Sequence, residues 1–128
     1  MVSTKKLYTP DSANRALPLV RAIARDVSET ALRMQATWKK LEAGGLGAEA
    51  RQRLQDSFDE GRTRLLALNG ELEELGVELK DPLQGLLDFR AVRGGAEVYL
   101  CWELDEERVG HWHELDAGYA GRQPIETF

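Results

Sequence analysis

The chain has 128 residues, of which 42% are hydrophobic and 30% charged, and its formal net charge is −5. This size and composition indicate one globular domain with a single core and exclude a second domain. No apolar run approaches the roughly eighteen residues of a membrane-spanning helix, and the N-terminal segment lacks the apolar run of a signal peptide. The single cysteine, Cys101, cannot form an intramolecular disulfide, so we expect a cytosolic protein without a membrane partner.

A long first helix is predicted over residues 9–43. Thr9 is typical of an N-cap and Pro10 of the first helical position. Apolar residues then recur in alternating steps of four and three, which is a heptad pattern: Ala13, Leu17, Val20, Ala24, Val27, Ala31, Met34, Trp38 and Leu41. Residues 1–43 also contain eight Lys or Arg against four acids. These bases are scattered around the helix, so we expect a solvated surface and no nucleic-acid site.

A second helix is predicted over residues 48–75, after a glycine-rich connection. Its apolar positions again follow steps of four and three, through Leu54, Phe58, Gly61, Leu65, Leu68, Leu72 and Leu75. Gly76 is placed as the left-handed residue that ends the helix. We expect the two helices to form a long, coiled-coil-like antiparallel hairpin.

After Gly76 the apolar period changes from about 3.6 to 2, which predicts an antiparallel sheet over residues 77–115. Residues 116–128 are predicted to be a loop and tail. The expected fold is therefore α+β, a single domain over residues 1–128 with a small antiparallel β-meander packed on one end of the hairpin. Helix one carries extra apolar residues near its start, at Ala16, Leu19 and Ile23, which indicates the end that the sheet covers.

The other end of the hairpin has apolar side chains that the sheet is too short to cover, at Met34, Trp38, Leu41, Leu54 and Phe58. Exposed clusters of large apolar residues usually mark interfaces. We therefore expect a homodimer in which these tips pack against a second copy. The alternative is that each tip packs only on itself.

The C-terminal third holds both histidines, and the register of its last hairpin decides which face they take. A four-residue loop, Asp105–Arg108, pairs Leu104 with Val109 and turns His111 and His113 toward the helices. A one-residue slip would instead gather Cys101, Glu103, His111 and His113 on one face, as plausible ligands for zinc. We favour the four-residue loop, because it keeps Val109 and Leu115 on the core side.

A metal site is one interpretation of this segment. It would use His111, His113 and Asp116 for a divalent transition metal, with Glu114, Asp88 or Glu103 as other candidates for the third ligand. The alternative is that His113 hydrogen-bonds a buried carbonyl or carboxylate. Two histidines without a settled third ligand carry little weight, so no cofactor is expected. Cys101, within a strand, is interpreted as an inert packed residue.

The run after the last strand is the other candidate site. Gly118 and Gly121 allow close backbone approach, and Arg122 offers a planar fork for a carboxylate or phosphate, so a small anionic ligand or a protein partner can be accommodated. The alternative is that Arg122 bridges to an acid such as Asp116 and fixes the tail.

Three stretches resemble the family catalogued as domain of unknown function 2203: YTPDSANRALPLVR, ELGVELKDPLQGLLDF and CWELDEERVGHWHELDAGYAGRQPI. The resemblance implies a small cytosolic bacterial protein with no established activity or cofactor. The residues that match the family's strongest pattern are Trp102, Trp112, His113, Asp116, Gly118, Gly121 and Arg122. Our hypothesis is a non-catalytic, self-associating interaction or ligand-binding module with its site at these residues, and the alternative is a metal-binding protein or a metal-dependent hydrolase.

Overall fold

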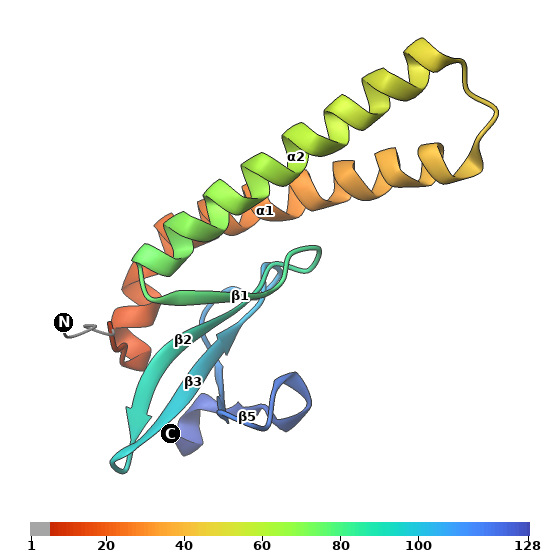
Figure 1. Cartoon of the computed structure of the whole chain (residues 1–128). Coiled ribbons are helices and arrows are strands. Elements are labelled where there is room, and N and C mark those ends of the chain that lie inside the picture. The colour runs from red at the N-terminus through yellow and green to blue at the C-terminus, as the bar shows by residue number, and fades with distance from the viewer. Residues whose placement is uncertain (1–5) are drawn as a thin grey trace.

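The computed structural model of the protein describes residues 6–128 and confirms the α+β fold predicted from the sequence. Helices α1 (Pro10–Ala43) and α2 (Ala48–Glu74) form an antiparallel hairpin that crosses one face of a sheet and extends well beyond it (Figure 1). Helix α1 begins with a capping box, in which the Ser12 amide donates to Thr9 Oγ1 over 3.1 Å and the Thr9 amide donates to Ser12 Oγ over 2.9 Å. None of these helices is long and apolar enough to cross a membrane, among the residues described.

Within residues 6–128 the sheet has five antiparallel strands, which lie side by side in chain order. They are β1 (Val77–Asp81), β2 (Leu86–Arg93), β3 (Ala96–Trp102), β4 (His111–Glu114) and β5 (Gln123–Pro124). The last strand was not predicted, because residues 116–128 read as loop and tail. Its two residues pair with His111 and Trp112 and so bring the C-terminal segment back along the edge of the sheet.

The passage from α2 into the sheet depends on a glycine. Gly76 has φ +78°, the left-handed conformation that only glycine adopts without strain, and it turns the chain from the helix into β1. A Cβ atom at this position would lie 2.8 Å from the Cβ of Lys6. The start of the chain is therefore held against the same turn, and the Tyr8 amide donates to the Arg90 carbonyl over 2.7 Å.

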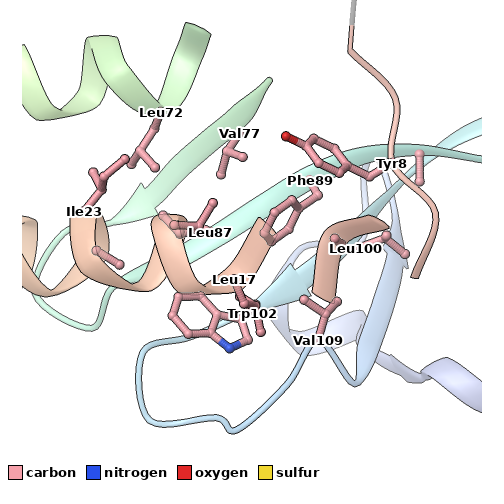
Figure 2. Close-up of a cluster of buried hydrophobic side chains, with 14 of the residues drawn as sticks. Tyr8, Leu17, Ile23, Leu72, Val77, Leu87, Phe89, Leu100, Trp102 and Val109 are labelled. Atoms are coloured by element: carbon pink, nitrogen blue, oxygen red, sulfur yellow. The ribbon is translucent and has the colours of Figure 1, made fainter. Parts of the chain in front are cut away.

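The core lies between the helices and the inner face of the sheet (Figure 2). Trp102 and Phe89 are fully buried there, together with leucines and valines of both helices and three strands, among them Leu17, Val20, Val27, Leu72, Val77, Leu87 and Leu100. Burial of such side chains stabilises the fold by about 25 cal/mol per Å² of apolar surface. Ala16 and Ile23 take part in this packing as predicted, whereas Leu19 is 56% exposed, so its assignment to the sheet-facing surface was wrong.

The predicted register of the β3–β4 hairpin was also wrong. The observed pairs are Cys101 with His111, Leu100 with Trp112 and Tyr99 with His113, which is the one-residue slip. Val109 does fill the core, but it does so from the loop before β4, and Leu115 is 53% exposed. Both residues had been used to set the phase of the strand, and neither lies within it.

Helix α1 is the reason for this register. The Val109 amide donates to Asn14 Oδ1 over 2.8 Å, and Arg21 donates to the Glu107 carbonyl over 2.7 Å. The indole nitrogen of Trp102 donates to the Glu106 carbonyl over 3.0 Å. These bonds give partners to backbone groups of the loop over residues 103–110. The loop is therefore held in this longer form, and the four-residue turn is not formed.

Candidate functional site

The slipped register sorts the side chains of the sheet onto two faces. The inner face carries the apolar residues that contact the helices. We call the opposite one the outer face, and strand alternation places on it Glu78, Lys80, Asp88, Arg90, Tyr99, Cys101, His111 and His113. Tyr99, Cys101, His111 and His113 thus share a face with acids and bases of β1 and β2.

Asp88 and His113 form a buried pair at the centre of this face. His113 Nε2 lies 3.0 Å from Asp88 Oδ1 and 3.1 Å from Oδ2, and the side chains are 4% and 2% exposed for Asp88 and His113. The other ring nitrogen, Nδ1, lies 2.7 Å from the carbonyl oxygen of Glu114. Because a carbonyl can only accept, Nδ1 carries a proton and Nε2 is the nitrogen that faces the carboxylate.

Cys101 is the third member of the cluster. It pairs with Asp88 across β2 and β3 and is 1% exposed. Burial, together with the negative charge of Asp88, raises the pKa of the Cys101 thiol to about 12, so the sulfur is protonated near neutral pH. Burial also raises the pKa of Asp88, against the opposing effect of His113.

These three side chains bring a nitrogen, an oxygen and a sulfur together. One ligand atom from each of Asp88, Cys101 and His113 lies within 4.8 Å of the other two, and this is the single group of three such residues found among residues 6–128. Metal-bound histidines usually donate their second N–H to a carbonyl, which fixes the ring and its tautomer. The bond from His113 to Glu114 has this arrangement.

A cavity of about 190 Å³ adjoins the cluster. Asp88, Cys101 and His113 line it together with six other residues: Lys80, Leu86, Tyr99, Leu115, Gly118 and Tyr119. Leu115 and Tyr119 are 53% and 49% exposed, so the cavity reaches solvent beside the loop that follows β4. We call this space the outer pocket.

A charged network borders the outer pocket on the side of β1. Glu78 accepts hydrogen bonds from Lys80 over 2.9 Å, from Arg90 over 2.8 Å and from the Tyr99 hydroxyl over 3.0 Å. Partial burial alone would raise the pKa of Glu78, but these three bonds lower it to about 2. The ammonium of Lys80 also lies 5.1 Å from the centre of the Tyr99 ring, which fixes it at the pocket wall.

Arg122 is engaged elsewhere. Its Nη2 atom lies 2.7 and 2.8 Å from the two carboxylate oxygens of Glu106 and 2.9 Å from His111 Nδ1. The guanidinium can only donate, so Nδ1 of His111 accepts and is unprotonated. The predicted bridge from Arg122 is therefore present, but Glu106 and not Asp116 is the acid. It fastens the tail to the loop between β3 and β4.

The residues singled out from the sequence are thus divided among several places. Trp102 lies in the core, while Trp112, also on the inner face, donates from its indole nitrogen to Thr127 Oγ1 over 2.8 Å. His113 and Gly118 line the outer pocket, whereas Asp116 is exposed and Gly121 lies at the end of a short 3-10 helix. The expectation that His111 and His113 turn toward the helices was wrong, because the observed register places both side chains on the outer face of the sheet.

Asp88 and Cys101 are two of the three residues of the cluster, although the sequence did not single out either of them as a site residue. Asp88 had been one of four candidates for a third ligand, and Cys101 had been set aside with the disfavoured register. A signal for Asp88 was present: it is an acid between Leu87 and Phe89, which are both fully buried. A charged residue inside an apolar strand run is buried only when it is paired.

Among comparisons with known proteins, one protein-family model matches most of the chain. The family model described as "Uncharacterized conserved protein (DUF2203)" matches residues 6–125. No match was found among curated proteins or among solved structures.

Proposed function

Because the chain belongs to this family of uncharacterized conserved proteins, whose description gives no activity, we propose a function from its own residues. The protein is a metal-binding module that holds one divalent transition-metal ion between Asp88, Cys101 and His113. The observation that carries this proposal is the position of their three ligand atoms within 4.8 Å of one another, beside the outer pocket.

The donor set favours zinc among the common metals. Thiolate and imidazole ligands suit zinc and related transition metals, whereas Mg²⁺ and Ca²⁺ prefer oxygen. Zinc bonds to N, O and S are about 2.0–2.3 Å long, so side-chain movements on the order of 1 Å would bring the three atoms into place. Three protein ligands leave a fourth position, which the outer pocket adjoins.

Metal binding replaces protons in this site. His113 Nε2 and Asp88 share one proton in the metal-free protein, and the Cys101 thiol holds another. A bound dication favours the thiolate, since its charge reverses the effect of the neighbouring carboxylate. Binding of one ion near neutral pH should therefore release about two protons.

The proposed function is binding and not hydrolysis. A metal-dependent hydrolase needs a group near the metal that can take a proton from water. The Lys80 and Tyr99 side chains at the pocket wall hold their protons near neutral pH. The hydrogen bond that Lys80 donates to Glu78 raises the pKa of Lys80, and burial together with the separate hydrogen bond that Tyr99 donates to Glu78 raises the pKa of Tyr99. Asp88 is not free to take this proton either, because in the proposed site it is a ligand of the metal.

Zinc titration of the purified, tag-free chain tests the metal site. Isothermal titration calorimetry in two buffers of different protonation enthalpy gives the affinity, the stoichiometry and the number of protons released. We expect one zinc per chain, and we expect Asp88→Asn, Cys101→Ser and His113→Gln each to lower the affinity at least about a hundredfold. Absence of a stoichiometric zinc site in the unaltered protein would overturn the proposal.

Matched controls separate this ligand set from the one expected from the sequence. His111→Gln and Asp116→Asn remove the other two candidate ligands, which lie toward Arg122 and at an exposed position. We expect both variants to bind zinc as the unaltered chain does. A loss of affinity in these variants, with none in Cys101→Ser, would contradict the assignment.

Self-association through the hairpin is the second part of the proposal. Trp38 is 49% exposed, although its ring packs against Phe58 at 5.7 Å between ring centres, and the two residues line a groove with Met34. An antiparallel second copy would cover the exposed Trp38 ring and this groove in both chains.

Sedimentation velocity tests this interface. We expect a dimer at micromolar concentration for the unaltered chain and a monomer for Trp38→Glu. Leu19→Glu is the control, because Leu19 is similarly exposed but lies near the start of α1. A monomeric unaltered chain would remove the dimer and leave the metal proposal unaffected.

A further inference from the structure

The outer pocket is larger than a metal ion requires. A volume of about 190 Å³ corresponds to roughly six water molecules at about 30 Å³ each. The three proposed ligands occupy one side of it, and Lys80, Leu86, Leu115 and Tyr119 line the rest. A ligand of about four to six non-hydrogen atoms would therefore fit at the fourth coordination position.

The charges around the pocket favour an anion. With a divalent ion bound, the charges of the Asp88 carboxylate and the Cys101 thiolate cancel those of the metal. Glu78 forms ion pairs with both Lys80 and Arg90, and Glu97 supplies a second negative charge near Arg90, so the positive charge that faces the pocket is the ammonium of Lys80. Lys80 is the member of the network that lines the pocket, and it is held there by Glu78 and the Tyr99 ring.

The apolar walls narrow the class of anion. Leu86 and Leu115 line the pocket with the ring of Tyr119, so part of the ligand would contact hydrocarbon. Inorganic phosphate is polar on every side and would lose hydrogen bonds to water there. A carboxylate with a short alkyl chain can place its charge toward the metal and Lys80 and its carbons against these walls.

We infer that the outer pocket binds a short-chain carboxylate, with one carboxylate oxygen on the metal held by Asp88, Cys101 and His113 and the charge facing Lys80. The inference rests on the metal site proposed above and names the ligand class of that site. Binding is a ligand exchange: the bond from the metal to a water molecule breaks, a bond from the metal to a carboxylate oxygen forms, and no covalent bond within the carboxylate changes.

Replacing zinc with cobalt allows the coordination to be followed by absorption spectroscopy, because Zn²⁺ has a filled d shell and no ligand-field bands. The full chain is loaded with Co²⁺, and the ligand-field bands and the thiolate-to-cobalt charge-transfer band are recorded while sodium propionate is added at constant ionic strength. We expect a saturable change in the ligand-field bands. Phosphate, titrated in the same way, should bind at least about tenfold more weakly, since it cannot use the apolar walls.

Variants of Lys80 test the charge. Lys80→Met should weaken propionate binding about threefold to fivefold, because the Lys80 side chain is 39% exposed and solvent screens its charge, while Lys80→Arg should largely restore the affinity. Lys40→Met is the matched control, because it removes the same charge from an exposed position near the end of α1. Retained cobalt bands and an unchanged thermal unfolding midpoint show that each variant is folded and loaded.

The outcomes separate the two proposals. Absence of the thiolate-to-cobalt band would overturn the metal site and this inference with it. A normal band with no saturable response to propionate would overturn the inference alone. Tighter binding of phosphate than of propionate, or equal propionate affinity in Lys80→Met and the unaltered chain, would also contradict it.

Discussion

His113 Nε2 faces both carboxylate oxygens of Asp88, at 3.0 and 3.1 Å, in a part of the outer face where both side chains are almost completely buried. Strands β2 and β4, which carry the two residues, both pair with β3 and do not pair with each other. The pair therefore links two strands through side chains alone. Removing one member of a buried pair leaves a polar group without its partner, and this is far more costly than removing both.

A double-mutant cycle on the metal-free protein measures this coupling. We expect His113→Ala to lower the free energy of unfolding by about 3 kcal/mol, because Asp88 is left buried without a partner. The double variant Asp88→Ala, His113→Ala should cost at least about 1 kcal/mol less than the sum of the single variants. Urea denaturation of the four proteins gives these values, and strictly additive costs would contradict a coupled pair.

The thiol of Cys101 should be unreactive in the folded, metal-free chain. Its pKa of about 12 leaves almost no thiolate at pH 8, and the side chain is 1% exposed. We expect alkylation by iodoacetamide at pH 8 to be at least about a hundredfold slower in buffer than in 8 M urea. Mass spectrometry follows the modification without a background, because the chain has one cysteine. Comparable rates in the two conditions would show that the thiol is accessible.

Glu78 should make the protein sensitive to acid. Its pKa is about 2 in the folded protein, against 4.5 for an ordinary glutamate. Because the folded-state pKa is lowered, the stabilisation is complete above about pH 5 and is lost as the pH falls toward 2. Since the side chain is 25% exposed and partly screened by solvent, we expect Glu78→Gln to cost only about 1 kcal/mol at pH 7.

The same variant should lose less stability between pH 7 and pH 3 than the unaltered chain, and urea denaturation at both pH values measures the difference. Glu71→Gln, at an exposed position of α2, is the control and should keep the full acid dependence. An unchanged dependence in Glu78→Gln would show that its three hydrogen bonds do not stabilise the folded state.

Two glycines should respond in opposite ways to the same substitution. Gly76→Ala introduces a side chain at φ +78° and places its Cβ 2.8 Å from Lys6, so we expect a loss of about 2 kcal/mol or more. Gly70 lies inside α2 with nothing within 4 Å of its Cβ position, so Gly70→Ala should stabilise by up to about 1 kcal/mol. Thermal unfolding midpoints of the two variants should therefore move apart.

The sequence by itself determined the fold class and the order of the two helices and of a sheet that follows them, but not the last strand, β5. Local features are sufficient for this: Thr9 and Pro10 begin a helix, Gly76 ends one, and the change of apolar period marks the start of the sheet. Each of these signals involves residues within one or two helical turns of each other, where the chain's own geometry decides the structure.

The site was decided by the tertiary structure. A strand period of two is equally satisfied by two registers, and they place His111 and His113 on opposite faces of the sheet. The choice is made by Asn14, which binds the backbone of Val109 from 95 residues away and holds Val109 in the core outside the strand. No local pattern contains that contact. It is nevertheless what brings His113 to the same face as Asp88 and Cys101, and so creates the cluster on which the proposed function depends.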